Sequence, residues 1–402
     1  MAENTTPRLL ILNQMAGPMT WELAEYLGNE LGRVALLTGH PDTLAKGSQE
    51  KVVIYPAAPY LRGNYLRRIL SWLRYLGQAV LWLWRWPPTI PLLLFSNPPF
   101  LPWLGYLMHH LRNQSYAVMV HDIYPDVLVR LKCLKGNSFI AQIWNRLNRV
   151  AYEQAKVVLT LGESMATSLT KQFDPLLTKA RRVEIVYPWA DTEVIHPIPK
   201  GKNWFARQYG QVGKLTVMYS GNMGIIHDIE TMLAVANKFR AVPNVHFMFI
   251  GAGPKWQLVS DTLREQRLQN VTLLPWQAEE IIPFSLTTAD VALISIEPAA
   301  AGLAVPSKFI YSIAAGSMVL VLATGDSEVA SWVHQYDCGK VLEPGDIQGV
   351  CDTIESLLKD EETLKGYKNR VRSIALQKFS RSRNNLIFAS KIQRFLFNGE
   401  TV

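Results

Sequence analysis

The chain has 402 residues, of which 49% are hydrophobic and 18% charged, and its formal net charge is +8. This composition excludes a disordered chain, and the length suits two domains better than one core. The three cysteines are at no disulfide or metal-binding spacing, and no segment resembles a signal peptide, so we expect a cytoplasmic protein. No run of about twenty apolar residues occurs, so we expect no membrane-spanning helix.

In the first half of the chain, apolar strand candidates alternate with helical patterns. Strands are expected at 8–12, 33–38, 51–55, 90–95, 116–120 and 157–161. Helices are expected at 21–31, 64–85, 102–111, 139–154 and 164–172. This alternation predicts a parallel sheet with helices on both faces.

Prolines interrupt every periodicity between residues 187 and 199, and we interpret this segment as a linker. A second alternating series follows, with strands expected at 215–219, 245–250, 271–274, 291–296, 319–322 and 340–342, and later helices at 347–358 and 383–397. The fold class is therefore α/β, with two doubly wound, Rossmann-like domains facing across a cleft. We place the domains at 1–190 and 191–382, and expect residues 383–402 to cross back to the first.

The expected helix at 64–85 is basic and rich in tryptophan. No acidic residue occurs between Glu50 and Asp122. A helical period places Tyr65, Ile69, Trp72, Leu76, Val80 and Leu83 on one face, and Arg67, Arg74, Gln78 and Arg85 on the other. Such a helix is typical of a segment on anionic lipid, although an ordinary domain helix packed on the sheet has the same pattern.

We predict that this segment contacts an anionic membrane surface. The residues expected to do so are Arg67, Arg74, Trp82, Trp84, Arg85 and Trp86. Because no known nucleic-acid-binding module is present, we expect no nucleic-acid partner.

Several motifs follow predicted strands, where the ligands of open α/β sheets bind. In the first half, Gly17 and Pro18 form a turn into a helix, and His121 and Asp122 follow the strand at 116–120. An imidazole at such an edge suits proton or hydrogen-bond chemistry near neutral pH. The alternative is an aspartate that caps the next segment beside a structural histidine.

In the second half, Gly221, Asn222 and Gly224 follow one strand, while Gly251 and Gly253 follow the next. Small residues there let backbone amides approach an anion, although plain strand-to-helix turns explain them equally well. Ser307 and Lys308 stand at the start of a short helix between two expected parallel strands. A hydroxyl, an ammonium and helix N-terminal amides suit a phosphate, and the alternative is a solvated lysine.

The ordered motifs GNMG, FIGAGP, NVTLLPWQ, DVALISIEP and VPSKFIYSIAAG together resemble the C-terminal domain of family 4 glycosyltransferases, which have the GT-B fold. VHDIYPDV and YPWAD are similar to the subgroup that builds colanic acid and O-antigen polysaccharides. The resemblance implies retaining transfer of a sugar from a nucleotide-diphosphate sugar (a UDP- or GDP-sugar), without metal or cofactor. The nucleotide would bind the second domain and the acceptor the first.

The same resemblance implies roles for individual residues. His121, Lys308 and Asp122 would be catalytic, and the donor would be bound by Gly17, Gly221, Asn222, Gly224, Gly251, Gly253, Trp276, Glu297, Ser307 and Tyr311. The chain departs from the family at its two usual glutamates, where it has Leu303 and Tyr311. It also has Asn222 and His227 where family members often carry arginine and lysine.

The main interpretation is a glycosyltransferase at the cytoplasmic face of a membrane, acting on a lipid-linked or membrane-lipid acceptor. Three alternatives remain open: a nucleotide-sugar 2-epimerase of the same fold, a catalytically degenerate nucleotide-binding module, and a two-lobed sugar-binding protein. An epimerase acting on a soluble sugar would not require the arginine- and tryptophan-rich surface.

Overall fold

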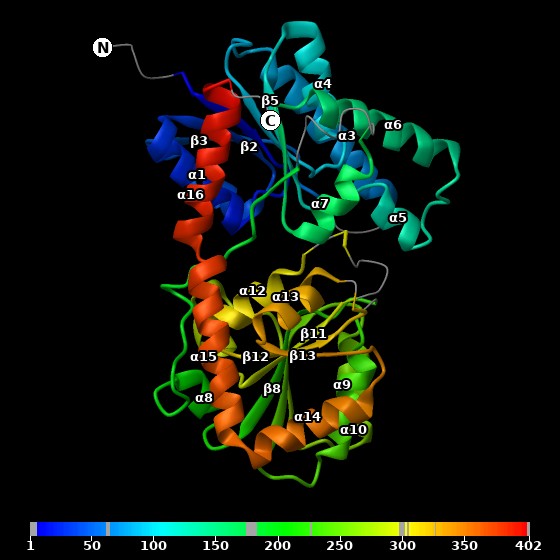
Figure 1. Cartoon of the computed structure of the whole chain (residues 1–402), viewed down its shortest axis with the longest axis vertical. Helices are drawn as coiled ribbons and strands as arrows, with labels where there is room; N and C mark the ends of the chain where they lie inside the picture. The colour runs from blue at the N-terminus through cyan, green and yellow to red at the C-terminus, as the bar shows by residue number, and fades with distance from the viewer. Residues whose placement is uncertain are drawn as a thin grey trace. The chain divides into compact units, whose positions relative to one another are not determined.

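The computed structural model describes residues 6–61, 65–173, 183–225, 227–296, 302–303, 305–325 and 327–399. The chain divides into two compact units, one of residues 1–187 and 384–402, and the other of residues 188–383. Each unit contains one parallel sheet with helices packed around it (Figure 1). The expectation of two doubly wound α/β sheets is confirmed.

The sheet of the first unit has the strand order β3-β2-β1-β4-β5-β6-β7, and every neighbouring pair is parallel. Its strands are β1 (Leu9–Leu12), β2 (Val34–Thr38), β3 (Val52–Pro56), β4 (Leu92–Phe95), β5 (Tyr116–Val120), β6 (Val157–Thr160) and β7 (Val183–Ile185). The order reverses between β1 and β4, because chain-adjacent strands run outward from β1 on one side and from β4 on the other.

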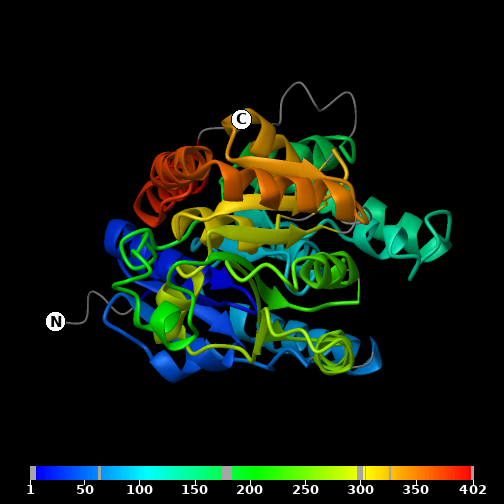
Figure 2. The same ribbon diagram turned by 90° about the horizontal axis from the view of Figure 1, so that it is seen from below.

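The helices of the first unit are α1 (Pro18–Leu31), α2 (Pro41–Lys46), α3 (Tyr65–Leu83), α4 (Leu101–Arg112), α5 (Asp126–Arg130), α6 (Phe139–Gln154), α7 (Glu163–Thr170), α16 (Arg381–Ile392) and a π-helical turn at Gln393–Phe397. Helix α16 begins just before the boundary between the units and lies mostly in the first. In two perpendicular views, α6 extends away from the sheet of its unit (Figures 1 and 2).

The sheet of the second unit has the order β10-β9-β8-β11-β12-β13, again with parallel neighbours. Its strands are β8 (Leu215–Asn222), β9 (Val245–Ala252), β10 (Val271–Leu274), β11 (Val291–Ser295), β12 (Met318–Leu322) and β13 (Gly339–Leu342). Its helices are α8 (Trp204–Gln208), α9 (Ile229–Lys238), α10 (Trp256–Glu265), a short 3-10 turn at Glu279–Ile281, α11 (Ile282–Leu286), α12 (Ser307–Ala314), α13 (Glu328–Tyr336), α14 (Ile347–Lys359) and α15 (Glu361–Lys378).

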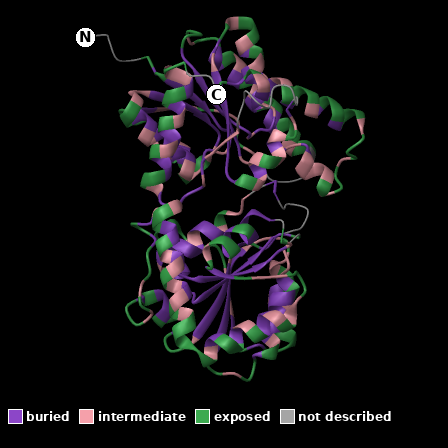
Figure 3. Cartoon of the chain, in the orientation of Figure 1, coloured by how far each residue is buried: buried purple, intermediate pink, exposed green. Residues whose placement is uncertain are grey.

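Most strands are buried along their whole length, as Figure 3 shows by the purple of the central strands in both units. Parallel strands covered on both faces consist of continuous apolar runs, because neither face meets water. This explains why sequences such as YAVMV at β5 and MVLVL at β12 were recognisable as strands.

Helix α12 is fixed on its inner side by aromatic packing. Phe309 is fully buried, with its ring centroid 5.3 Å from that of Trp332 and 5.9 Å from that of Phe379. At the other end of the helix, the Arg372 guanidinium of α15 donates to the Ala314 carbonyl at 3.0 Å. These contacts hold the first turn of α12, with Ser307 and Lys308, in a defined position.

The buried face of α3 differs from the predicted one. Ile69 is exposed, whereas Tyr75, Ala79 and Trp82 are buried. The cause is a set of inward contacts that period alone does not reveal: the Tyr75 hydroxyl donates to the Leu37 carbonyl at 2.7 Å, and the Gln14 amide donates to the Ser71 carbonyl at 3.1 Å.

The observed rotation of α3 changes which of the predicted membrane-contacting residues can face a membrane. Trp82 is only 4% exposed and packs against Tyr55, so it belongs to the core and its assignment as a membrane residue was wrong. Trp86 is half-buried against Trp82, whereas Trp84 is exposed. Arg67, Arg74 and Arg85 are exposed as predicted.

Candidate functional site

A cavity of about 420 Å³ lies at the carboxyl ends of the strands of the second unit. It sits where the strand order reverses between β8 and β11, the position at which open α/β sheets bind ligands. The residues that line it come from the ends of β8 and β9, the segment after β10, helix α11 and the first turns of α12: Ser220, Gly221, Asn222, Ile250, Trp276, Gln277, Ile282, Ser285, Leu286, Ser307, Lys308, Tyr311 and Ser312.

Two glycines allow β8 and β9 to reach the cavity side by side. Gly221 pairs with Gly251, and their φ angles are 137° and 142°, values that residues other than glycine rarely adopt. A Cβ on Gly251 would lie 2.0 Å from the Gly221 carbonyl oxygen, and one on Gly221 would lie 2.4 Å from Cε of Lys308. Glycine at 221 therefore makes the room that the Lys308 side chain occupies.

Among the described residues that line this cavity, Lys308 has the only charged side chain. Its ammonium donates to the Tyr219 hydroxyl and lies 4.0 Å from the centroid of the Tyr219 ring. The Tyr219 hydroxyl donates to the Asn222 carbonyl at 2.5 Å and is 2.9 Å from Nδ1 of His227. Lys308 is thus held by neutral partners.

Burial lowers the pKa of the Lys308 ammonium to about 7, because the charged form loses hydration in this setting. Burial and the nearby charge of Lys308 lower the pKa of His227 to about 4, so this imidazole is neutral at pH 7. Burial also raises the pKa of the Tyr219 hydroxyl. A partly hydrated lysine with a near-neutral pKa beside a helix start is suited to receive an anion, which would supply the missing countercharge.

The structure brings together part of the predicted donor set. Gly221, Asn222, Trp276, Ser307, Lys308 and Tyr311 all line the cavity. Gly224, Gly251 and Gly253 lie behind it as supports. The Gly224 amide donates to Nδ1 of His227 at 3.2 Å, and a Cβ on Gly253 would meet the Met223 carbonyl oxygen at 2.5 Å. Glu297 lies outside the described residues.

Sequence reasoning missed the wall formed by α11, which contributes Ile282, Ser285 and Leu286. This helix has five residues and carries no recognisable motif. Its apolar side chains face the cavity beside Trp276, whose side chain is 58% exposed at the rim. An apolar wall beside an aromatic ring suits a flat ring system, and the lysine on the other side suits an anion.

The cavity lies in a stretch of the chain that matches a known family model. Residues 214–360, which contain β8 to α14 and every residue that lines the cavity, match the family model described as glycosyl transferases group 1. The chain carries a group 1 glycosyltransferase domain. It is 26% identical over 308 residues to the probable glycosyltransferase WbjE of Pseudomonas aeruginosa, covering 74% of this chain and 75% of that protein.

Two solved structures show the fold of the whole chain. The structure of Anabaena HepE in complex with UDP-glucose has a TM-score of 0.70 at 15% identity, covering 96% of this chain and 99% of that one. The structure of WaaG, described as a glycosyltransferase involved in lipopolysaccharide biosynthesis, has a TM-score of 0.69 at 13% identity, with coverages of 96% and 99%. These structures show that the fold is GT-B. The family match and the similarity to WbjE show that the enzyme is a glycosyltransferase.

The first unit of this glycosyltransferase carries the predicted His121, Asp122 and Gly17 at the carboxyl edge of its sheet. The His121 amide donates to Oγ of Ser96 at 2.9 Å, and its ring packs edge-on against Phe95 at 5.3 Å. Burial lowers the pKa of His121 to about 4. Desolvation raises the pKa of the Asp122 carboxyl to about 6, although much of its side chain remains open to solvent.

Gly17 precedes α1 in extended backbone with φ −73°, so the turn does not require glycine there. A Cβ at this position would meet only Nε2 of His40, at 3.9 Å. The first unit therefore holds the neutral imidazole of His121 at a fixed strand end. At the start of α1, position 17 has room for a side chain larger than that of glycine. In the sheet order, β1 and β5 flank β4, so both motifs lie at one edge.

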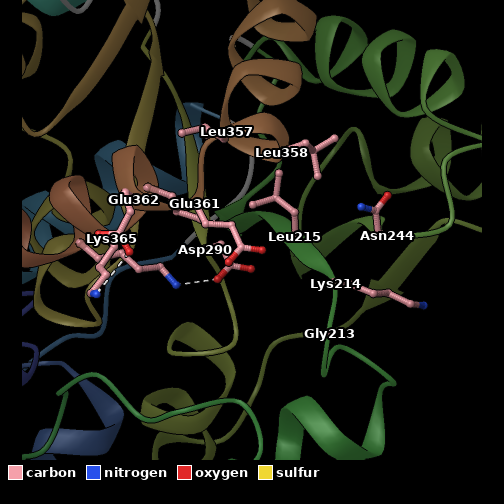
Figure 4. Close-up of a pocket in the computed structure, with 12 residues that line it drawn as sticks. Gly213, Lys214, Leu215, Asn244, Asp290, Leu357, Leu358, Glu361, Glu362 and Lys365 are labelled. Atoms are coloured by element: carbon pink, nitrogen blue, oxygen red, sulfur yellow. Dashed lines mark hydrogen bonds and ion pairs between the residues drawn. The ribbon is translucent and has the colours of Figure 1, made fainter.

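A second cavity of the glycosyltransferase, of about 560 Å³, lies at the opposite, amino-terminal edge of the second sheet (Figure 4). Its main charged group is Asp290, just before β11. This carboxylate accepts from the ammonium groups of Lys200 and Lys368, and from the Thr216 amide at 2.8 Å. Because the protein satisfies these charges internally, we interpret the cluster as structural.

Among the described residues, no three His, Cys, Asp or Glu side chains form a metal-binding group. In the same part of the chain, no helix is both long and apolar enough to cross a bilayer.

Proposed function

We propose that this glycosyltransferase moves a sugar, with retention of configuration, from a UDP- or GDP-sugar to a lipid-linked or membrane-lipid acceptor. The observation that carries the donor half of the proposal is Lys308 at the start of α12, lining a cavity at the switch point of the sheet. The complex of the similarly folded HepE with UDP-glucose supports a nucleotide-sugar donor.

The diphosphate would bind between Lys308, Ser307 and the amides of the first turn of α12. Sugar transfer separates negative charge onto the departing diphosphate, and a cation placed before the reaction stabilises it most where water is limited. Lys308 would leave the neutral Tyr219 hydroxyl for the phosphate oxygens. We propose that it fulfils this role without a metal ion or a further cofactor, with the nucleotide sugar as substrate.

The base and ribose would occupy the apolar side of the cavity. Trp276 offers a ring for stacking, and Tyr311 and Ser312 offer hydroxyls where the family's second glutamate is replaced. In the first unit, we propose that His121 contacts the donor sugar when both substrates are bound, with Asp122 beside it. Because its pKa is about 4, the imidazole would act as a neutral hydrogen-bonding group.

The acceptor half of the proposal rests on α3. Its outward side carries Leu66, Leu73 and Leu81, which are 79%, 56% and 68% exposed, beside Arg67 and Arg74. The exposed Trp84 follows this stripe, with the Arg112 guanidinium 4.7 Å from its ring centroid. An apolar stripe flanked by arginines fits an anionic lipid surface. We therefore propose a peripheral enzyme at the cytoplasmic face of a membrane.

The proposal is tested by thermal unfolding in the presence of UDP, GDP, ADP or dTDP. A ligand at about 100 times its dissociation constant stabilises the native state by about 2.7 kcal/mol, which gives a measurable increase in Tm. We expect a selective increase with UDP or GDP that is lost in Lys308→Met and kept in the matched control Lys202→Met, whose lysine is exposed elsewhere in the second unit. Equal shifts in both variants would contradict the assignment of the diphosphate to Lys308.

A further inference from the structure

Helix α6 exposes a row of large apolar side chains. Phe139 is 76% exposed, Ile140 62%, Ile143 41% and Leu147 39%. Their spacing places them along one side of the helix. Figure 3 shows α6 with much of its length coloured as exposed, and Figures 1 and 2 show it extending from its unit. A contiguous apolar surface of this kind marks an interaction site.

The opposite side of α6 is firmly packed, so the exposed row is not a displaced core face. The Trp144 ring centroid lies 4.8 Å from that of Phe100 and 6.1 Å from that of Tyr124. Asn148, which is buried, accepts from Nε1 of Trp103 at 2.8 Å and donates to the Tyr124 carbonyl at 2.7 Å. These specific hydrogen bonds fix the rotation of the helix about its axis.

The same aromatic cluster connects α6 to α3. The ring of Trp72 on α3 packs edge-on against Phe100 at 5.7 Å, and Phe100 in turn contacts Trp144. Both helices therefore direct their inner faces to one cluster and leave their outer apolar rows uncovered by the described residues. A rigid connection between the two helices would let a single flat surface engage both.

The charge around α6 indicates the chemistry of the partner. Residues 127–152 contain five basic residues and no acidic one. All five basic residues are exposed, namely Arg130, Lys132, Lys135, Arg146 and Arg149. The one acidic residue of α6, Glu153 near its end, is half-buried. Apolar side chains beside lysine and arginine match the interface of an anionic bilayer, where the former enter the headgroup region and the latter pair with phosphates.

We infer that α6 is a second membrane-contacting helix, which places Phe139, Ile140, Ile143 and Leu147 into the surface of an anionic phospholipid bilayer. This deepens the proposed function, because it rests on a membrane-bound acceptor and adds a contact that α3 does not supply. Two separate helices would fix the orientation of the first unit on the bilayer, whereas a single helix leaves it free to roll.

The test is flotation of the full-length protein with vesicles of phosphatidylcholine, with and without phosphatidylglycerol. The apolar variant is Phe139→Gln with Ile140→Gln, and its matched control is Leu386→Gln, since Leu386 on α16 is 57% exposed. Because this variant removes two large apolar side chains from the headgroup region, we expect it to partition at least about tenfold less than the wild-type protein. The control should float like the wild-type protein.

The charge variant is Lys132→Glu with Lys135→Glu and Arg146→Glu, and its control is Lys202→Glu. Each basic residue near an anionic surface contributes about 1 kcal/mol, so the triple variant should lose more than about a hundredfold in partitioning to phosphatidylglycerol vesicles. Little of this loss should appear with phosphatidylcholine alone.

Unchanged flotation of both α6 variants would overturn the inference. It would do so above all if charge reversal of Arg67 and Arg74 on α3, together with Arg85 just after it, abolished flotation. A change in oligomeric state on gel filtration with unchanged flotation would also overturn it, in favour of contact with a second copy. The affinity for UDP should stay the same in every α6 variant. If no nucleotide binds the wild-type protein while the α6 variants lose flotation, the proposed function fails and this inference stands.

Discussion

The titration of Lys308 gives the sharpest prediction for the donor site. Its pKa is lowered to about 7, so near pH 8 most of the empty enzyme has an uncharged Lys308. The two groups around it stay neutral there: His227 has a pKa of about 4, and the pKa of Tyr219 is raised by burial. Within this cluster, Lys308 is therefore the group that changes charge between about pH 7 and pH 10.

A bound diphosphate favours the charged lysine and raises its pKa. Between the pKa of the empty site and that of the complex, binding must take up one proton, so the affinity falls about tenfold per pH unit, or 1.36 kcal/mol. From about pH 8 to about pH 9, the protonated fraction of the empty site falls from about one tenth to about one hundredth. The diphosphate of UDP keeps a constant charge over this range, because phosphates lose their second proton near about pH 6.

The measurement is isothermal titration calorimetry of UDP binding at about pH 7, 8 and 9, in buffers of different ionisation enthalpy. We expect the Kd to rise about tenfold over the last step, with nearly one proton taken up per UDP. Lys308→Arg removes the slope, because a guanidinium stays charged throughout. Lys308→Met should bind weakly at every pH and also lack the slope.

A Kd that is independent of pH in the wild-type enzyme, with no proton uptake, would refute this reasoning. It would mean that the phosphate does not meet Lys308, or that the ammonium is already charged in the empty site. The control Lys202→Met should retain the wild-type slope, which separates a local effect from the general loss of positive charge.

Three further predictions follow from the geometry. Gly221→Ala should destabilise the protein by about 1–3 kcal/mol in urea unfolding and weaken UDP binding, because φ is 137° and the new Cβ meets Cε of Lys308; normal binding would contradict the tight approach. Asp290→Asn should lower the free energy of unfolding by about 3 kcal/mol near pH 7, because it leaves the buried ammonium of Lys200 without its countercharge. Burial alone would raise the pKa of Asp290, but its two lysines lower it below the ordinary value of 3.8. The stabilisation is therefore present above pH 3.8 and is lost as the pH falls through the lower pKa of the folded state. A difference in stability between wild type and variant that stayed constant down to acid pH would be inconsistent with this reasoning. His121→Ala should lower kcat about a hundredfold with little change in UDP affinity, and near-normal turnover would assign the imidazole a structural role only.

The sequence predicted the sheets well for a physical reason. A strand such as β12 (Met318–Leu322) or β5 (Tyr116–Val120) is a short apolar run between polar turns, and its burial in a parallel sheet requires that run. Two of the missed elements lack this signal: β7 (Val183–Ile185) has three half-buried residues, and α2 (Pro41–Lys46) is a helix of six residues with one buried side chain.

The rotation of α3 could not be read from its sequence, because the helix is apolar on more than one side. Leu66, Leu73 and Leu81 are as hydrophobic as the residues that pack inward. The rotation of the helix is determined by Tyr75 and Ser71, whose hydrogen bonds involve partners far away in the chain. A period locates an amphipathic face only where a single face is apolar.

The departures of this chain from the family pattern and the unusual pKa of Lys308 have a common basis. Asn222 lines the cavity and His227 is neutral at pH 7, so neither supplies the positive charge that arginine or lysine would bring to those positions. Without such neighbours and without a carboxylate at Tyr311, the lysine packs on a phenol ring and has no countercharge among the described cavity residues. An added basic residue should therefore act in two ways. Asn222→Arg would supply a permanent phosphate contact, and its charge would lower the pKa of Lys308 further. UDP affinity at about pH 9, where Lys308 is mostly uncharged in the empty site, should then exceed that of the wild-type enzyme, and an unchanged affinity would show that the arginine does not reach the phosphate.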